Sequence, residues 1–570
     1  MHKSLISAAA ALALLLPPIA RAQGAPQGPT IVPFPSTVLP LKHAPQPTVA
    51  AITAADLMTR LYIFADDSMQ GREAGAMGNF KGTAYIAGEA RKIGLVPAGD
   101  DGTYFQTVPL KERAVEAASR FTAGGAPLAF GKEWGVMAAR SAMADDQPVL
   151  YGGTAGGPDM LPSARAAGKV VVYRLGPNTA ALRSADGGAH PPAAVIVIGP
   201  AAFLGYFTQP SEFVDDGPPA AGAPLFFVTP EAAAKLFDAP LAGLEPGDAG
   251  RAVSYDVRVT VSPVPYPARN VVGIIPGSDP ALRNEYVAIG AHNDHIGFNH
   301  TPVDHDSLRI FNHIVRPLGA DSRTGQATAA QAAEVNRELA AWRAAHPGTA
   351  RLDSIDNGAD DDGSGTVTAL EIAQKIASLD PRPRRSILFV WHVGEEKGLL
   401  GSTYFTDHPT VPRDSIVTQL NMDMVGRGDA WDMTGTTKDG AFMHGGSNLL
   451  YLVGSRRLST ELGNLVEQVN TDDHHGFVFN YAFDADGHPE NVYCRSDHYE
   501  YARYGIPITF FTTGLHSDYH QVTDEPEYID YQHMARIGNL IEDVAVHVAD
   551  LDHRPVVDHP KPDPHGACQQ

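Results

Sequence analysis

Residues 386–402, SILFVWHVGEEKGLLGS, constrain the fold more than any other stretch of the chain. The apolar and β-branched run at 387–390 predicts a strand buried on both faces, as in a parallel sheet. Gly394 and two adjacent carboxylates, Glu395 and Glu396, follow it. In parallel α/β sheets, ligands bind beyond the carboxyl ends of the strands. Two carboxylates there repel each other unless a cation lies beside them, although an isolated Glu-Glu pair is more often solvated.

Strands and helices alternate through the second half of the chain. Strands are expected at 270–275, 286–291, 386–392, 416–420 and 506–511, and helices at 364–379 and 531–549. This alternation predicts an α/β fold, a three-layer α/β/α domain around a mainly parallel sheet. With 570 residues, the chain is long enough for more than one domain.

Two segments interrupt this pattern. Between 119 and 262, short β-rich runs alternate with loops rich in Gly, Pro and Ala, which predicts an inserted β-rich domain. Residues 297–357 form a second insertion, with a helix expected at 328–343. The expected order is a signal peptide at 1–22, a Pro-rich arm at 23–48, the α/β domain at 49–118 and 263–555 around the inserted domain, and a loose tail at 556–570.

The amino terminus and the charge indicate where the protein works. Residues 1–22 combine a basic start at Lys3 with an apolar core and an Ala-Arg-Ala ending, which is typical of a secretory signal peptide. No later stretch is apolar for about 18 residues, so we expect no transmembrane segment and a periplasmic or secreted protein. The net charge of −22 disfavours nucleic acid and anionic membranes as partners.

The chain has only two cysteines, Cys494 and Cys568. Two cysteines do not make a disulfide scaffold, and whether they pair stays open at this point. They are also too few for a cysteine-based metal site. Any metal ion must therefore be bound by His, Asp and Glu.

Four further motifs supply such ligands. They are His292-x-Asp294 at the end of one expected strand, Asp360-Asp361-Asp362 before an expected helix, Asp423 at the end of a strand, and Tyr519-His520 after the last strand. Each motif alone has a plain alternative, such as a solvated acidic loop or a helix cap. Together they predict one site at one sheet edge, and its His and carboxylate ligands suit zinc.

The order of the motifs His-x-Asp, Gly-Ala-Asp-Asp-Asp-Gly-Ser-Gly, Gly-Glu-Glu, Asn-Met-Asp and Tyr-His resembles the co-catalytic zinc exopeptidases of peptidase family M28. The resemblance covers roughly residues 50–118 and 263–545, and the segment between them resembles a protease-associated (PA) domain. In the family, the peptide bond after the bridging aspartate is often cis, which implies a cis bond between Asp361 and Asp362.

The resemblance implies a Zn²⁺ pair and assigns a role to each site residue. One ion would be held by His292, Asp361 and Asp423, and the other by Asp361, Glu396 and His520, with Asp361 as the bridge. Glu395 would be the general base, and Asp294 would support His292. Arg495 would contact the substrate and Tyr519 would donate to the oxyanion, or both would be structural residues.

Histidines and serines outside this pattern have simpler interpretations. His295, His392 and His498 match no ligand of the family, so we expect them to be scaffold residues. Ser496 and Ser517 lack the His and Asp partners of a serine nucleophile, so a serine mechanism is not expected.

The resemblance implies an enzyme that hydrolyses N-terminal residues from peptides. Two zinc ions would activate a bridging water, and Glu395 would take its proton and pass it to the leaving amine. A metallo-carboxypeptidase or dipeptidase of the same superfamily is the alternative, and basic residues in the pocket would favour it. A non-catalytic receptor on the same scaffold is a remote one. The oligomeric state cannot be predicted.

The insertion at 297–357 begins shortly after His292 and ends beside Asp361. It must therefore lie close to the metal site. Long ordered loops at active sites commonly act as lids. We expect the insertion to restrict access and to favour short peptides.

Overall fold

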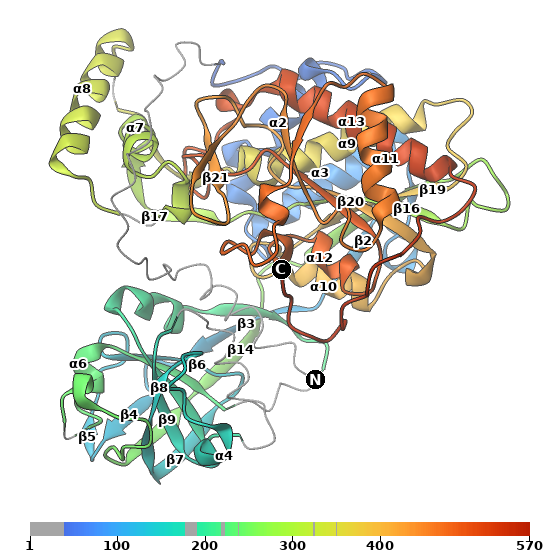
Figure 1. Ribbon diagram of the computed structural model, residues 1–570. Helices are drawn as coiled ribbons and strands as arrows, with labels where there is room; N and C mark the ends of the chain where they lie inside the picture. Colours follow the sequence, from blue (N-terminus) through green and yellow to red (C-terminus); the bar gives the residue numbers. More distant parts are fainter. Residues whose placement is uncertain (1–38, 177–190, 218–222, 238, 323–324, 349) are drawn as a thin grey trace. The chain divides into compact units, whose positions relative to one another are not determined.

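The computed structural model describes residues 39–176, 191–217, 223–237, 239–322, 325–348 and 350–570 (Figure 1). The expected signal peptide at 1–22 lies outside these residues, as does most of the expected Pro-rich arm. The described part of the chain divides into two compact units, Pro109–Val264 and the described residues before and after it. We call these the inserted unit and the α/β unit.

A nine-stranded sheet forms the centre of the described α/β unit. Its order is β1 (Val96–Pro97), β15 (Ala268–Ile275), β19 (Ser386–His392), β16 (Tyr286–His292), β20 (Ile416–Met422), β25 (Ile508–Thr512), β23 (Leu449–Val453) and β24 (Val478–Asn480), with β2 (Phe105–Val108) also paired to β15. The four strands β19, β16, β20 and β25 are parallel. β15 and β23 join them antiparallel. The predicted α/β fold is thus confirmed, but the sheet is mixed, because parallel pairing is limited to the centre and to β23 with β24.

Helices cover both faces of this sheet (Figure 1). One face packs against α2 (Ala54–Phe64), α3 (Met77–Ile93), α9 (Gly365–Ala377), α11 (Thr460–Asp472) and α13 (Tyr531–Asp550), and the other against α10 (Leu400–Asp407) and α12 (His498–Ala502). Successive residues of β19 point to opposite cores: Phe389 enters the first, and Leu388 and Val390 the second. A strand with cores on both faces must be apolar throughout, which explains the continuous apolar run in the sequence.

The inserted unit has its own sheets and cores. Its described strands form a five-stranded sheet of β6 (Trp134–Met137), β12 (Leu225–Val228), β10 (Ala194–Ile198), β9 (Val170–Arg174) and β8 (Val149–Thr154), and a four-stranded sheet of β5 (Ala126–Pro127), β4 (Arg120–Ala123), β13 (Val253–Val257) and β7 (Ala142–Gln147). A third sheet joins β11 (Ser211–Val214), β3 (Leu110–Val115) and β14 (Val259–Pro263). Because β3 pairs with β14, the unit begins at 109 and not at the expected 119.

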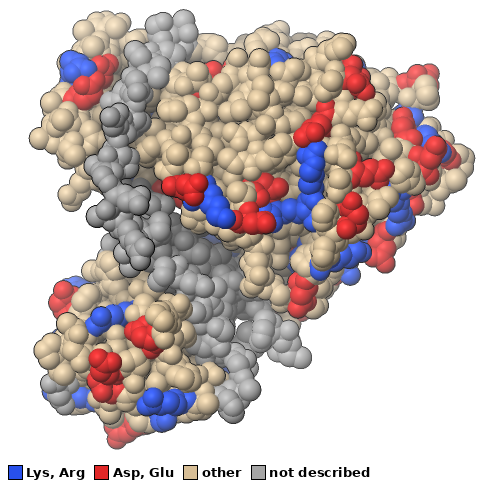
Figure 2. All heavy atoms as spheres, in the orientation of Figure 1, with Lys and Arg blue, Asp and Glu red and all other residues tan. Residues whose placement is uncertain are grey.

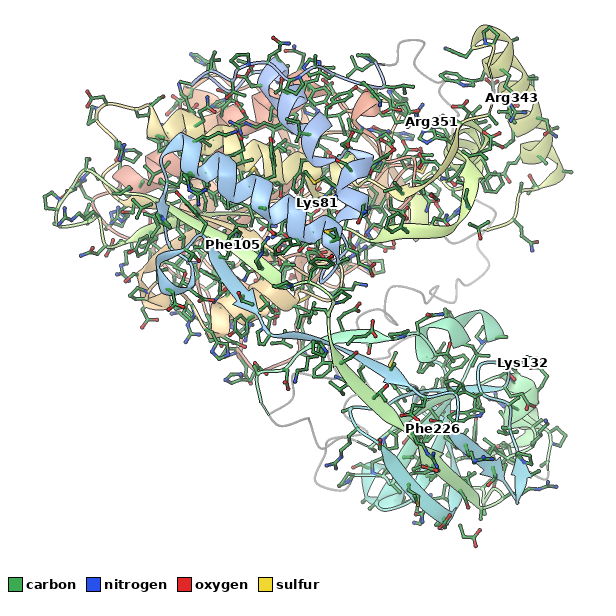
Figure 3. All side chains as sticks on the ribbon, turned by 180° about the vertical axis from the view of Figure 1, so that it is seen from behind. Lys81, Phe105, Lys132, Phe226, Arg343 and Arg351 are labelled. Atoms are coloured by element: carbon green, nitrogen blue, oxygen red, sulfur yellow. A yellow bond between two sulfur atoms is a disulfide. The ribbon has the colours of Figure 1, made fainter. Side chains whose placement is uncertain are left out.

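The second insertion, 297–357, is part of the α/β unit. Its first and last elements, β17 (Gly297–Asp304) and β18 (Leu352–Asp356), pair as antiparallel strands. Between them lie α7 (His305–Val315), the short turn η5 (Gly319–Asp321) and α8 (Ala329–Ala345). The α7–α8 pair shares only a small cluster around Ile310, Ile314 and Val315. Figure 3 labels Arg343 and Arg351 in this insertion. Arg351 forms an ion pair with Glu527, so the base of the insertion is tied to the rest of the unit.

The last residues are anchored, although a loose tail was expected. Residues 556–570 contain no helix or strand, but Cys568 forms a disulfide with Cys494. The carbonyl of Gln570 accepts from the N–H of Gly487 at 2.8 Å, and its side-chain oxygen accepts from the N–H of Tyr493 at 2.9 Å. Pairing of the cysteines therefore fixes a segment that composition alone suggested was free.

Charged side chains are mixed on the surface. On the face shown in Figure 2, the Lys and Arg side chains lie next to Asp and Glu side chains. Exposed ion pairs such as Arg384 with Asp552, 2.6 Å apart, illustrate this mixing. Within the described part of the chain, no helix is both long and apolar enough to cross a membrane.

Candidate metal centre

The predicted ligands meet at the carboxyl edge of the parallel strands. His292 is the last residue of β16, which runs in register with β19 up to His392. Glu395 and Glu396 follow β19, and Asp423 directly follows β20. Parallel strands that end at one edge bring these side chains together although they are far apart in the sequence.

Two groups of candidate ligands share one aspartate. The first group is His292, Asp361 and Asp423, and the second is His295, Asp361, Glu396 and His520; within each group, one ligand atom of every residue lies within 4.8 Å of the others. In the first group, Nε2 of His292 lies 3.0 Å from Asp361 and 3.8 Å from Asp423. Asp361 therefore offers one oxygen to each group.

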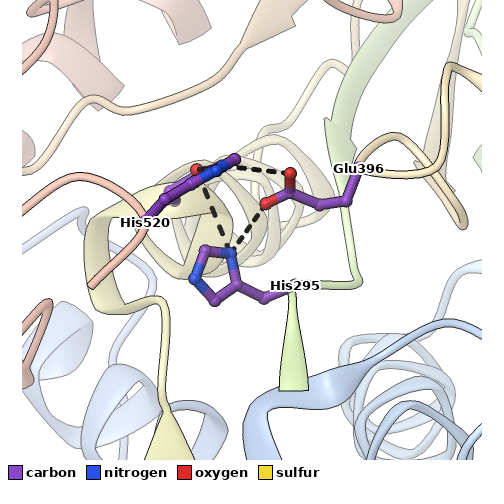
Figure 4. A group of neighbouring side chains, drawn as sticks. His295, Glu396 and His520 are labelled. Atoms are coloured by element: carbon purple, nitrogen blue, oxygen red, sulfur yellow. Dashed lines mark hydrogen bonds and ion pairs between the residues drawn. The ribbon is translucent and has the colours of Figure 1, made fainter. Parts of the chain in front are cut away.

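The second group contains a histidine that the sequence reasoning treated as scaffold. Nε2 of His520 lies 3.0 Å from both Asp361 and Glu396. Nδ1 of His295 lies 2.8 Å from Glu396. His295 therefore lies in the site itself, whereas the sequence predicted a scaffold residue outside it. Figure 4 shows the rings of His295 and His520 on two sides of the Glu396 carboxylate. The position of His295 directly after the His-x-Asp motif was the only signal in the sequence.

Of the three consecutive aspartates, only Asp361 faces both groups. Asp360 accepts from the N–H of Gly426 at 2.7 Å and lies 3.2 Å from His516. Asp362 accepts from the N–H of His292 at 3.0 Å. The peptide bond between Asp361 and Asp362 is cis, as the family resemblance implies. The outer two carboxylates thus hold the local backbone while the middle one is left for a ligand role.

Asp294 holds the ring of His292 through its main chain. Nδ1 of His292 lies 3.2 Å from the carbonyl oxygen of Asp294 and 3.7 Å from its carboxylate. A carbonyl can only accept, so Nδ1 carries the hydrogen and Nε2 is free to bind a metal ion. The Asp294 carboxylate also accepts from the N–H of Glu395 at 3.2 Å. Asp294 therefore connects a candidate ligand with the candidate base.

The two neighbouring glutamates have opposite electrostatics. Burial raises the pKa of Glu395 well above its ordinary value, and the nearby carboxylates of Asp423 and Glu396 raise it further. Burial acts in the same direction on Glu396, but His520 and His295 outweigh it and bring its pKa down to about 2. A carboxylate with a raised pKa suits proton transfer, whereas one that stays ionised suits metal binding.

At Asp361, the residue shared by the two groups, burial and neighbouring charges also act on the pKa in opposite directions. Burial alone would raise the pKa of Asp361, but hydrogen bonds from His292 and His520 lower it well below the ordinary value. Burial lowers the pKa of both histidines, and the carboxylates around them raise it well above the ordinary value. The site is thus a compact set of carboxylates and imidazoles, a combination that suits a bound cation.

A cavity of about 370 Å³ opens over the two groups. Asp361, Glu395, Asp423 and His520 form one side of it. The remainder is lined by apolar residues from several loops, namely Val315, Leu318, Met424, Phe442, Phe483, Val492, Phe510 and Leu515. The predicted position of the insertion close to the site is correct, because Val315, Leu318 and Asp321 belong to it.

Tyr519 and Arg495 also line this cavity. A side-chain N–H of Arg495 donates to the hydroxyl of Tyr519 at 3.3 Å. The same guanidinium pairs with Asp321 at 2.9 Å and lies 4.0 Å from Glu490. Burial raises the pKa of Tyr519 well above its ordinary value, so its hydroxyl keeps its proton.

Two other histidines have partners away from the cavity wall. His392 lies 3.0 Å from the hydroxyl of Tyr501 and 3.3 Å from Asp497. His498 lies 2.8 Å from the carbonyl of Tyr493, and burial lowers its pKa to about 3. Neither histidine belongs to a ligand group.

Comparison with known proteins identifies the region that carries the site. Residues 270–545 match the model of peptidase family M28. The similarity to this family extends over just under half of the chain. All candidate ligands lie inside the matched residues.

Curated proteins and a solved structure are similar to parts of the chain. The chain is 33% identical to leupeptin-inactivating enzyme 1 of Streptomyces exfoliatus over 96 residues, 15% of this chain and 22% of that protein. It is 31% identical to leucine aminopeptidase 1 of Paracoccidioides brasiliensis strain Pb03 over 197 residues, 32% of this chain and 44% of that protein. The match thus spans less than half of each relative. An aminopeptidase from Aneurinibacillus sp. strain AM-1 aligns in structure with a TM-score of 0.49 and 16% identity, over 90% of this chain and 97% of that one.

Proposed function

We propose that the chain is an exported two-zinc exopeptidase that removes N-terminal residues from peptides. The observation that carries this proposal is the pair of His–carboxylate groups that share Asp361 in the wall of one cavity. The match of residues 270–545 to a peptidase family supports peptides as the substrates.

The donor atoms fit zinc. His and carboxylate ligands with an orienting contact behind the histidine are the usual zinc environment, and Nε2 of His292 is left free for the metal by the carbonyl of Asp294. We assign His292, Asp361 and Asp423 to one ion and Asp361, Glu396 and His520 to the other. Zinc bound in this way polarises the scissile carbonyl and activates a water molecule.

The protein's own side chains then handle the protons. Glu395 lies in the cavity wall but in neither ligand group, with its carboxylate 4.0 Å from Nε2 of His292. Its raised pKa suits a group that takes a proton from water and returns it to the leaving amine. The Tyr519 hydroxyl accepts from Arg495, so its own hydrogen is available to the oxygen that gains negative charge.

The charge of the cavity favours an N-terminal amine over a C-terminal carboxylate. Among the described residues that line it, Arg495 is the one Lys or Arg, and Asp321 already pairs with it. A carboxypeptidase or dipeptidase needs a basic group free to bind the substrate carboxylate. Glu490 and the carboxylates of the ligand groups instead offer negative charge to a substrate ammonium.

Substitution of each glutamate tests the proposal. Glu395→Gln should keep two zinc ions and lower kcat by about 10²–10⁴, the usual contribution of general base catalysis, with a smaller change in KM. Glu396→Gln should lose part of its zinc and recover activity when zinc is added. Glu338→Gln, on the surface of α8, is the matched control. Loss of zinc in Glu395→Gln with retention in Glu396→Gln would reverse the roles.

A substrate panel tests the direction of cleavage. Amino-acid p-nitroanilides and C-blocked dipeptides should be hydrolysed, and N-blocked dipeptides should not. The reverse result would favour the carboxypeptidase alternative. Zinc analysis of the purified protein also excludes the receptor alternative if two ions per chain are found.

Two further assignments belong to this proposal. We assign the inserted unit to the PA-like domains because it is β-rich and interrupts the α/β unit. We assign the protein to the periplasm or the exterior from the signal-like sequence at 1–22 and from the disulfide, since disulfides persist in oxidising compartments. Amino-terminal sequencing of the mature protein would test the second assignment.

A further inference from the structure

The turn η5 of the insertion lies against the segment that carries His520. The N–H of Ala320 donates to the carbonyl of Tyr519 at 3.0 Å. A Cβ atom added to Gly319 would lie 2.4 Å from that carbonyl oxygen, and Gly319 has a left-handed φ of +54°. Only glycine allows this approach, so the turn and the backbone of Tyr519 form a fitted contact.

A chain of polar contacts runs from this turn into the cavity. Asp321 pairs with Arg495 at 2.9 Å, and Arg495 donates to the hydroxyl of Tyr519 at 3.3 Å. The side chains of Asp321 and Arg495 are 15% and 21% exposed, so solvent screens their attraction only in part. The next carboxylate, on Glu490, is 4.0 Å from the guanidinium. Without the charge of Asp321, the guanidinium of Arg495 would lose its close ion pair and keep the longer contact with Glu490.

The helix before this turn holds the other side of the same segment. Arg309 of α7 lies 3.5 Å from Asp518, and the side chain of Asn312 donates to Gln521 at 3.3 Å. His520 between them has a left-handed φ of +53°, a conformation that costs energy for a residue with a Cβ atom. Contacts on both sides explain how this strained residue is held in place.

We propose that Asp321 is a positioning residue, which acts through Arg495 to hold the Tyr519 hydroxyl towards the scissile carbonyl. The inference rests on the proposed peptidase function and extends it, because it makes the insertion part of the catalytic machinery and not only a lid. Asp321 touches neither the candidate ligands nor the reacting atoms. Its effect must therefore appear in turnover and not in zinc content.

Asp321→Asn removes the charge and keeps the size. It should lower kcat on leucine p-nitroanilide about tenfold, the scale of one charge-assisted hydrogen bond, with a smaller change in KM. Zinc should remain at the wild-type stoichiometry. Asp321→Glu should restore part of the loss, and Glu338→Gln, which removes a charge 3.3 Å from Arg337 elsewhere in the insertion, should match the wild type.

A double-mutant cycle separates positioning from a general structural effect. In a Tyr519→Phe background, Asp321→Asn should cost less than twofold, because the hydroxyl that it positions is gone. An equal loss in both backgrounds, no loss in either, or loss of zinc would overturn the inference. An inactive wild-type protein would instead contradict the proposed function itself, so the two failures are distinguishable.

Discussion

The two segments that interrupt the α/β unit differ in whether they have a hydrophobic core of their own. The inserted unit contains two buried clusters, one around Trp134 and Phe226 and one around Phe207 and Phe227. Among its described residues, the insertion at 297–357 has only the small cluster around Ile310. α8 contributes no fully buried residue among those described. A segment with a core can fold by itself, whereas one without a core depends on the surface that it covers.

The two segments also differ in what they contribute to the candidate site. The insertion supplies Leu318 and Asp321 to the cavity and touches the backbone of Tyr519. The inserted unit leaves and re-enters the sheet at Val108 and Ala268, which are paired neighbours on β2 and β15. Removal of the inserted unit would thus leave two chain ends side by side. We expect the insertion to be necessary for the chemistry and the inserted unit to be dispensable for it.

Removal of the insertion should have the largest effect. Phe298 and Ile355 are paired across the β17–β18 hairpin, so a short Gly-rich turn can replace 299–354. The contacts on both sides of His520 would be lost, and a displacement of about 1 Å at a catalytic group can cost about 10² in rate. We expect kcat to fall at least that far, with less than two zinc ions per chain. Full zinc with turnover within tenfold of wild type would show that the insertion is only a lid.

A core substitution in the inserted unit should lower stability without touching catalysis. Trp134 is fully buried, and its ring N–H donates to the carbonyl of Leu128 at 3.0 Å. Trp134→Ala should cost about 3–5 kcal/mol. In calorimetry, we expect one transition to move and the other to stay, with kcat unchanged. A common shift of both transitions would mean that the units unfold together.

Removal of zinc should destabilise the α/β unit and leave the inserted unit unchanged, the reverse of the effect expected for Trp134→Ala. Without metal, only the histidines of the site offset the charge of its carboxylates among the described residues. A ligand at 1,000 times its Kd stabilises the folded state by about 4 kcal/mol, which chelation would remove. We expect the Tm of the α/β unit to fall and that of the inserted unit to remain. An unchanged Tm after verified loss of zinc would place the metal elsewhere.

Removal of the inserted unit should have the smallest effect. A short Gly-Ser linker between Val108 and Pro265 should leave zinc content intact and change kcat/KM on a small p-nitroanilide by less than about threefold, or about 0.6 kcal/mol. Hydrolysis of longer peptides is the informative second measurement, because a PA-like unit that controls access would change only that rate. Loss of zinc would contradict the dispensability of the unit.

Much of the fold and site was predictable because strand ends and ligands coincide in the sequence. The apolar run at 386–392 matches β19, and the acids after it lie at the sheet edge as expected. Antiparallel pairing of β15 was not predictable, since pairing partners depend on contacts far away in the chain. The start of the inserted unit was placed ten residues late, because the pairing of β3 with β14 depends on a partner far away in the sequence.

Side-chain partners were harder to predict than side-chain positions. His295 was set aside because it matches no family motif, yet its ring reaches Glu396 across 101 residues of sequence. Asp321 gave no signal at all, because its partner Arg495 is 174 residues away and both lie in irregular segments. Such pairs become visible only after the backbone has been folded.

The disulfide has a practical consequence for anyone who produces this protein. Cys494 directly precedes Arg495, and its bond to Cys568 spans 74 residues. A batch made in a reducing cytosol would begin with two thiols and a free carboxyl-terminal segment beside the cavity. Two batches of identical sequence would then differ in activity according to their oxidation history. Titration of free thiols should accompany every kinetic comparison between expression hosts.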